Sequence, residues 1–174
     1  MKNRDLQTML FPGKYIQGKG AISVLPEVLY GYGGKPLILA TRSMTALAKE
    51  VLGEGAWVER FSGECCPEEL ERVEELARSR KASALAAVGG GKTIDCCKIV
   101  ADKLRIPVVV VPTIASTDAP CSGCAVVYTK DGVFDHVYYQ RHNPDVVLMD
   151  TEIIGGGAGS FSDLRDGGWP VDFF

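Results

Sequence analysis

The sequence predicts an α/β fold, a Rossmann-like parallel sheet with helices on both faces plus a β-hairpin. Three observations support this prediction. Strand-like and helix-like segments alternate along the chain, the strand-like segments are continuously apolar, and loops rich in glycine or hydroxyl residues follow two of them. Continuously apolar strands are typical of a parallel sheet that is covered on both faces. The 174 residues are enough for one domain with a substantial core.

The first strand–helix unit that we assign spans residues 36–53. The apolar run 36–40 reads as a buried strand, and the segment 43–53 has helical periodicity. Ser43 is a candidate N-cap because its hydroxyl can accept a backbone N–H, and Gly53 is a candidate helix stop.

The next unit spans residues 57–88. Residues 57–61 alternate as a strand does, and 67–81 read as a helix that begins at a proline. Its apolar face is formed by Leu70, Val73, Leu76 and Ala77. Residues 83–88 read as a strand.

The second half of the chain continues the pattern. A helix is predicted over 92–105, with Cys97, Val100, Ala101 and Leu104 facing inward. A β-branched buried strand follows at 107–113, and 145–150 read as a further strand. Between them, residues 126–139 are typical of a hairpin that turns at 130–132, Lys-Asp-Gly.

Composition and charge exclude several classes of partner. The net charge is −3 and the chain has no strongly basic run, so we expect neither nucleic acid nor an anionic membrane as a partner. No apolar run reaches the length of a transmembrane helix. The N-terminus lacks the apolar core of a signal peptide, which favours a cytoplasmic location.

The six cysteines do not form a disulfide framework of the secreted kind; they are Cys65, Cys66, Cys96, Cys97, Cys121 and Cys124. The last two make a C-x-x-C pair, which is compatible with a redox or zinc site. No second such pair exists, and the only histidines are His136 and His142. We therefore expect reduced, partly buried thiols and keep a redox or zinc role as the alternative.

A glycine-rich loop follows the strand predicted at 83–88. It reads Gly-Gly-Gly-Lys-Thr-Ile-Asp over 89–95 and leads into a helix. Glycines let the backbone approach a ligand closely, and the helix start offers free N–H groups and a positive dipole end. Together these features indicate a cradle for a pyrophosphate. The loop matches neither the Walker A nor the G-x-G-x-x-G spacing, so a glycine-rich helix start without a ligand is the alternative.

A hydroxyl-rich loop follows the strand predicted at 107–113. Residues 112–122 carry four hydroxyl groups and one carboxylate between prolines. Such groups can hold a ribose or a polyol by hydrogen bonds, although an ordinary capped turn has similar composition. Ligands of parallel sheets bind at the carboxyl ends of the strands, so the two loops together indicate a binding site more strongly than either alone.

These motifs resemble a known family. VGGGKTIDCCK followed by VVPTIASTDAPCSGCAVVYT is similar to the glycerol dehydrogenases of the iron-type (group III) alcohol dehydrogenase superfamily. FPGKYIQGKGAISVL, FSGE at 61–64 and NPDVVLMDTEII at 143–154 fit as well, so the resemblance covers roughly residues 11–154.

The resemblance implies NAD as cofactor and a division of roles between the two loops. It implies a pyrophosphate loop with its support at Gly89, Gly90, Gly91, Lys92, Thr93 and Asp95. It implies that the nucleotide is lined by Thr113, Ser116 and Thr117. Beside the nicotinamide and its ribose it implies Ser122, Cys124 and Tyr128. Asp118 matches an acidic residue of the catalytic site near the polyol substrate, which is glycerol or a related small polyol in the family.

One departure from the family pattern concerns the nucleotide specificity. The strand at 36–40 is normally followed by an acidic residue that binds the adenosine ribose hydroxyls, whereas here Thr41 and Arg42 stand there. A carboxylate would repel a 2′-phosphate, and this pair would not. The sequence therefore suggests tolerance of NADP.

The family also has a C-terminal helical domain, which holds the zinc ion through one aspartate and two histidines. That domain is absent from this sequence, and His136 and His142 do not match the ligand positions, so we expect no metal site and little activity. The alternatives are an active alcohol or diol dehydrogenase and a domain that only assembles. We also expect apolar surface exposed by the missing domain to favour a homo-oligomer.

The resemblance stops after Ile154, which predicts an NAD-binding domain over 1–154 and a non-family tail over 155–174. The family continues with an A-G-A-P segment that contains the first metal-binding aspartate. Codons can be chosen for the tail that, read one base out of frame, encode that segment, with Gly168 at the aspartate position and a stop directly after Phe174. We therefore hypothesise one inserted base after the codon for Ile154. A divergent natural tail is the alternative.

Overall fold

The computed structural model describes residues 10–157. Six strands form one parallel sheet in the order β1-β8-β5-β4-β2-β3, and two further strands, β6 and β7, form an antiparallel hairpin. The sheet strands are β1 (Lys14–Gly18), β2 (Leu37–Ala40), β3 (Trp57–Arg60), β4 (Leu85–Gly89), β5 (Val108–Pro112) and β8 (Val146–Asp150). The hairpin strands are β6 (Cys124–Tyr128) and β7 (Phe134–Tyr139).

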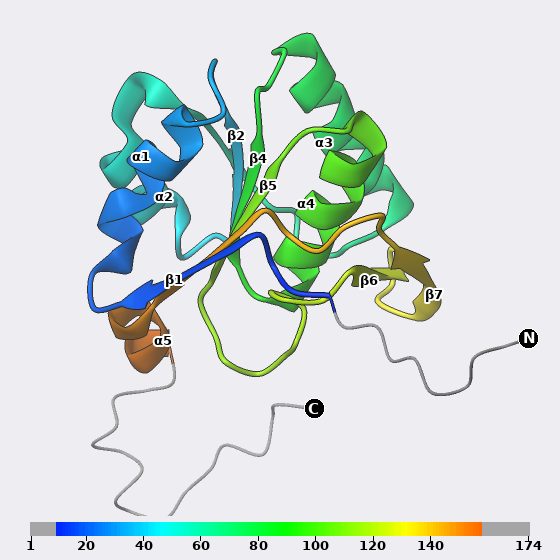
Figure 1. Ribbon diagram of the computed structural model, residues 1–174. Helices are drawn as coiled ribbons and strands as arrows, with labels where there is room; N and C mark the ends of the chain where they lie inside the picture. Colours follow the sequence, from blue (N-terminus) through cyan, green and yellow to red (C-terminus); the bar gives the residue numbers. More distant parts are fainter. Residues whose placement is uncertain (1–9, 158–174) are drawn as a thin grey trace, which may run out of the picture.

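Helices cover both faces of this sheet (Figure 1). On one face lie the short 3₁₀ helix η1 (Ala21–Val24), α1 (Leu25–Tyr30) and α2 (Thr45–Leu52), which share a core cluster with the sheet. On the other face lie α3 (Pro67–Ser79) and α4 (Gly91–Leu104), together with the inner side of the hairpin. A second 3₁₀ turn, η2 (Gly53–Gly55), follows α2, and α5 (Thr151–Gly157) follows β8.

The central strands are buried along their whole length, which explains their apolar composition. Every residue of β2, β4 and β5 is buried, because each of these strands has a neighbour on both sides and helices on both faces. The predicted α/β class, the parallel sheet and the additional hairpin are therefore confirmed.

Helix α4 is more deeply buried than the sequence suggested. Residues 93–101 are all buried, which extends well beyond the predicted inward face of Cys97, Val100, Ala101 and Leu104. The difference arises because the sheet packs on one side of α4 while β6 packs on another. Leu104, by contrast, is only partly buried.

Two further details correct the sequence-based prediction. Ser43 does not cap α2, because the N-cap position is occupied by Met44 and no side chain bonds there. Helix α2 instead begins on the carbonyl of Thr41, which accepts the backbone N–H groups of Met44 and Thr45. No element was assigned before residue 36, yet β1, η1 and α1 lie there.

The remaining boundaries agree with the prediction to within a few residues. Gly53 ends α2 with φ of 53°, a conformation that favours glycine. The hairpin turns between Thr129 and Val133, with Gly132 at φ of 79°. No helix of residues 10–157 is both long and apolar enough to cross a bilayer. Residues 155–157 of the predicted tail end α5, and the rest of the tail, including Gly168, lies outside the described residues.

Candidate functional site

The candidate site lies at the topological switch point of the sheet, where the order in which successive strands are added reverses. From β2 the chain passes outward to β3 and then returns to add β4 and β5 on the other side of β2. Helix α2 connects β2 to β3 over one face and α3 connects β3 to β4 over the opposite face. The carboxyl ends of β2 and β4 therefore flank a crevice of the kind in which open parallel sheets bind their ligands.

The glycine loop forms one wall of this crevice. Strand β4 ends at Gly89, Gly90 has an extended backbone, and α4 begins at Gly91 without a side-chain cap. The Ile94 N–H donates to the Gly90 carbonyl at 3.1 Å, which is the first hydrogen bond of the helix. The N–H groups of the three preceding residues thus lie outside the helical hydrogen-bond ladder and can serve an anion.

Side chains could not replace the first two glycines without displacing neighbours. A Cβ at Gly89 would lie 2.6 Å from Cγ2 of Thr41 and 2.9 Å from Oγ1 of Thr93. A Cβ at Gly90 would lie 3.2 Å from Cδ1 of Ile114. The loop is therefore packed between β2 and the loop after β5. This packing also places Thr41 against Gly89, and it leaves Thr93 only 1% exposed.

The hydroxyl-rich loop runs directly beside the glycine loop. Gly89 and Pro112 are partners in the β4–β5 register, and the Thr113 N–H donates to the Gly89 carbonyl at 3.1 Å. A Cβ at Gly91 would lie 3.5 Å from Cγ2 of Thr117. The structure thus brings the two sequence-predicted loops together, as their positions after adjacent strands indicated.

Turn hydrogen bonds organise the exposed part of this second loop. The Thr117 hydroxyl accepts the Ala119 N–H at 3.1 Å, and the Asp118 carbonyl accepts the N–H groups of Cys121 and Ser122. The side chains of Ser116, Thr117 and Asp118 lie on exposed residues. They are accessible to a ligand at this edge of the sheet.

The side chain of Lys92, at the start of α4, contacts Glu64 and Tyr128. Its Nζ lies 2.7 Å from Oε2 of Glu64 and 4.9 Å from the centre of the Tyr128 ring. This places Tyr128, from the hairpin, beside the glycine loop. It also gives a role to Glu64 of the FSGE segment, which sequence reasoning had noticed only as part of the resemblance.

A buried ion pair joins α4 to the second loop. Asp95 and Lys98 are 7% and 2% exposed, and Lys98 Nζ lies 3.5 Å from Asp95 Oδ1. Lys98 donates to the Ala119 carbonyl at 2.9 Å, to the Cys124 carbonyl, and more weakly to the Ser122 hydroxyl at 3.4 Å. Asp95 Oδ2 accepts the Val126 N–H at 3.1 Å. Both residues therefore hold the loop and the hairpin against α4.

Burial dominates the electrostatics of this pair. It raises the pKa of Asp95 and lowers the pKa of Lys98, although their mutual attraction opposes both shifts. Asp95 Oδ1 has no hydrogen-bond partner among the described residues. The sequence did not predict that Lys98 is buried at the site, because a lysine in an amphipathic helix is ordinarily solvent-exposed.

The cysteines are all free thiols. Cys65, Cys66, Cys96 and Cys97 are buried, Cys121 is exposed and Cys124 is half-buried. Burial raises the pKa of Cys97, which makes it a poor nucleophile and a poor metal ligand. Among residues 10–157 no three His, Cys, Asp or Glu side chains are grouped so that they could hold a metal ion.

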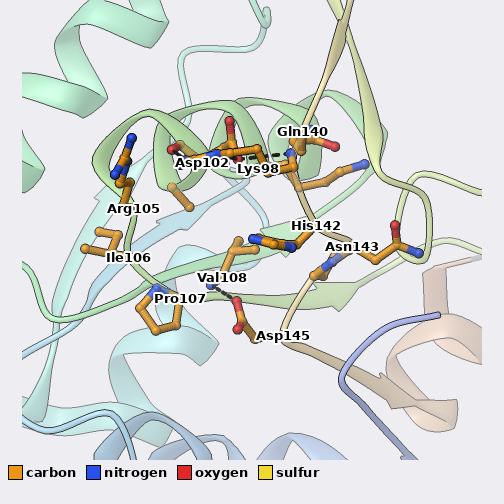
Figure 2. A pocket seen from close by; sticks show the side chains of 13 residues that line it. Lys98, Asp102, Arg105, Ile106, Pro107, Val108, Gln140, His142, Asn143 and Asp145 are labelled. Carbon is orange, nitrogen blue, oxygen red and sulfur yellow. Dashed lines mark hydrogen bonds and ion pairs between the residues drawn. The ribbon is translucent and has the colours of Figure 1, made fainter. Parts of the chain in front are cut away.

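Two cavities flank α4. One, of about 330 Å³, lies between the ends of β2 and β3 and the start of α4, and its walls include Gly90, Gly91 and Thr41. The other, of about 390 Å³, lies near the opposite end of α4 and the start of β5 (Figure 2). Figure 2 shows Asp145 bonded to the Val108 N–H, at 2.8 Å, below His142. None of the sequence-predicted site residues lines this second cavity.

The surroundings of the second cavity explain its polar lining. Burial opposes the ionisation of Asp102, but hydrogen bonds from the Tyr138 hydroxyl and from Arg141 outweigh it and hold the pKa of Asp102 below its usual value. These bonds attach the end of the hairpin to α4. The charged groups at this cavity thus serve packing, and the crevice beside the glycine loop remains the candidate functional site.

Comparison with known proteins gives consistent matches. The family model described as iron-containing alcohol dehydrogenase matches residues 12–151. A glycerol dehydrogenase of Thermotoga maritima is 42% identical over 165 residues, which are 90% of this chain and 44% of that protein. One from Escherichia coli is 38% identical over 152 residues, or 83% of this chain and 41% of that protein.

A solved structure agrees with these sequence matches. The crystal structure of a probable glycerol dehydrogenase from Sinorhizobium meliloti superposes with a TM-score of 0.82 at 41% identity. The match covers 86% of this chain and 42% of that one. The chain thus spans less than half the length of these relatives.

Proposed function

Because the chain belongs to the iron-containing alcohol dehydrogenase family, we propose that it is the dinucleotide-binding part of an NAD-dependent glycerol dehydrogenase. The observation that carries this proposal is the glycine loop at the switch point of the sheet, where backbone N–H groups of α4 face a crevice. This donor arrangement is the one that proteins use for a pyrophosphate. The 42% identity to a glycerol dehydrogenase supports the choice of a polyol as substrate.

The residues around the crevice fit a bound dinucleotide. Gly89, Gly90 and Gly91 leave room for the pyrophosphate, and Lys92 adds a positive charge beside it. The exposed hydroxyls of the second loop would bind the ribose, and Tyr128 would lie near the nicotinamide half. Asp118 is the acidic residue that we assign to the polyol. Asp95 acts indirectly, because it holds the hairpin in place.

The proposed reaction converts glycerol and NAD⁺ to dihydroxyacetone, NADH and a proton. When bound, the nicotinamide would supply the acceptor for a hydride, one proton with two electrons, that leaves the carbinol carbon. The hydroxyl proton of glycerol leaves as the carbonyl forms. The described residues of this chain bind and orient the two reactants.

The metal ion of the family does not fit the described residues. Residues 10–157 group no set of side chains that could hold zinc or iron. A metal that polarises the substrate oxygen contributes several kcal/mol of charge stabilisation to such a reaction. We therefore propose that the present chain binds dinucleotide without useful turnover. Glycerol oxidation, followed as NADH formation with and without added zinc, tests this, and clear turnover would contradict it.

Binding of NAD is best tested with a variant that folds normally. Gly91→Ala introduces a Cβ at an ordinary contact distance from Thr117, so stability should be unchanged. The same methyl group obstructs the cradle, and we expect NAD affinity measured by calorimetry to fall by about tenfold. The matched control is Gly18→Ala, whose Cβ meets no atom within 4 Å. Failure of the parent chain to bind either NAD or NADP would refute the proposed function.

A second candidate function, assembly, is favoured by the exposed apolar residues of the hairpin. Val133, Phe134 and Tyr139 are 62%, 60% and 77% exposed. Burying such residues between copies would be favourable. Sedimentation of the chain over a range of concentrations distinguishes a homo-oligomer from a monomer.

A further inference from the structure

The cavity beside the glycine loop is lined by two arginines that have no acidic partner within residues 10–157. Arg42 follows β2 and Arg60 ends β3, and both line the 330 Å³ cavity. In the β2–β3 register Ala40 is the partner of Arg60, so the pairing of two parallel strands brings the arginines to the same corner. Neither forms an ion pair with any residue in the range 10–157.

Three glutamates on or after β3 and on α3 pair with other cations. Glu59 pairs with Arg80 at 2.7 Å, Glu64 pairs with Lys92 at 2.7 Å, and Glu69 pairs with Arg72 at 2.7 Å. In the part of the chain that the structure describes, no carboxylate lines the cavity itself. The corner therefore combines two uncompensated positive charges with a wall of small polar residues, among them Thr41 and Ser62. An anion suits this environment better than a neutral ligand does.

The position of the corner identifies the anion. The cavity also borders Gly90 and Gly91, where the proposed function places the pyrophosphate. In dinucleotide-binding sheets an acidic residue at the end of the adjacent strand binds the ribose 2′-hydroxyl of NAD, and a nearby arginine accommodates the 2′-phosphate of NADP. Strand β2 is adjacent to β4, and here its end carries Thr41 and Arg42.

We propose that Arg42 and Arg60 bind the 2′-phosphate of NADP and make this chain prefer NADP to NAD. The proposal rests on the proposed function, because it needs the pyrophosphate at the glycine loop. It adds a residue, Arg60, that the sequence alone could not connect with the nucleotide. Arg42 lies next to Thr41 in the sequence, whereas Arg60 reaches the site only through strand pairing.

Calorimetric titration of the 174-residue chain with NAD and with NADP tests the proposal. We expect NADP to bind at least about tenfold more tightly, since each charged hydrogen bond to the phosphate contributes about that factor. Arg42→Gln and Arg60→Gln should each lower the NADP affinity by about tenfold and leave the NAD affinity unchanged. Arg78→Gln, which removes an arginine paired with Glu74 on α3, is the matched control and should change neither affinity.

The titrations distinguish the failure of the 2′-phosphate site from the failure of dinucleotide binding, on which it rests. Equal affinities for NAD and NADP, or equal losses for both nucleotides in the two variants, would overturn the 2′-phosphate site while dinucleotide binding stands. If neither nucleotide binds the parent chain, both proposals are wrong. Circular dichroism of each variant confirms that an altered affinity does not reflect unfolding.

Discussion

Replacing Lys98 by methionine should destabilise this fold strongly. Methionine fills a similar volume but removes the donor that bonds the carbonyls of Ala119 and Cys124. It also leaves Asp95 as a buried carboxylate without its cation. Removing one partner of a buried ion pair costs about 3–5 kcal/mol. No reduction for solvent screening applies, because Lys98 is 2% exposed.

The expected loss is a large part of the total stability. Domains of this size unfold with about 5–15 kcal/mol, so Lys98→Met should remove roughly a fifth or more of the free energy of unfolding. Urea denaturation followed by circular dichroism measures the free energy of unfolding. We also expect Asp95→Asn to recover part of the loss when it is combined with Lys98→Met, because it removes the uncompensated charge.

Lys103→Met provides the matched control on the same helix. Lys103 is 40% exposed in its side chain and lies 3.9 Å from Glu74. An exposed pair of this kind contributes less than about 1 kcal/mol. If Lys98→Met cost no more than Lys103→Met, the attachment of the second loop through Lys98 would be disproved.

Three further predictions follow from other parts of the chain. Gly89→Ala should lower the free energy of unfolding by about 1–3 kcal/mol in urea titrations, because its Cβ would lie 2.6 Å from Thr41; a neutral effect would show that the loop is not tightly packed. Burial opposes ionisation of Asp150, but the N–H groups of Ile22 and Glu152 outweigh it and lower its pKa below the ordinary 3.8. The stability that Asp150 contributes is therefore present above pH 3.8 and is lost as the pH falls through its folded pKa. In denaturation experiments, the difference in the free energy of unfolding between the parent chain and Asp150→Asn should therefore shrink below pH 3.8 and stay constant above it. Sequencing the coding DNA after the codon for Ile154 should reveal the inserted base, and codons that do not restore the family segment in any frame would reject it.

Several features of the fold were readable from the sequence because their signals are local. The apolar runs at β2, β4 and β5 identified buried parallel strands, and the glycine loop identified the start of α4. The rule that ligands bind at the carboxyl ends of strands then placed two loops at one site. The hydrogen bond from Thr113 to Gly89 confirms that these loops meet.

Other features depend on contacts between distant segments, and no local signal reveals them. Strand β1 is a short edge strand whose residues are mostly exposed, and only its pairing with β8, far along the chain, makes it a strand. Lys98 looks like a surface residue until the hairpin packs over α4 and the carbonyls of the second loop surround its ammonium group.

The sequence by itself determined the class of sheet, the position of the glycine loop and the family. Hydrophobic periodicity, a run of glycines and a family motif are all properties of residues that are neighbours in the sequence. Only the tertiary structure decided which distant side chains share a corner. Arg42 and Arg60 line one cavity because two parallel strands align Ala40 with Arg60. Glu64 reaches Lys92 because the segment after β3 lies near the start of α4. Strand register and burial arise from the packing of the whole chain, and they decide which charged side chains lie together at the site.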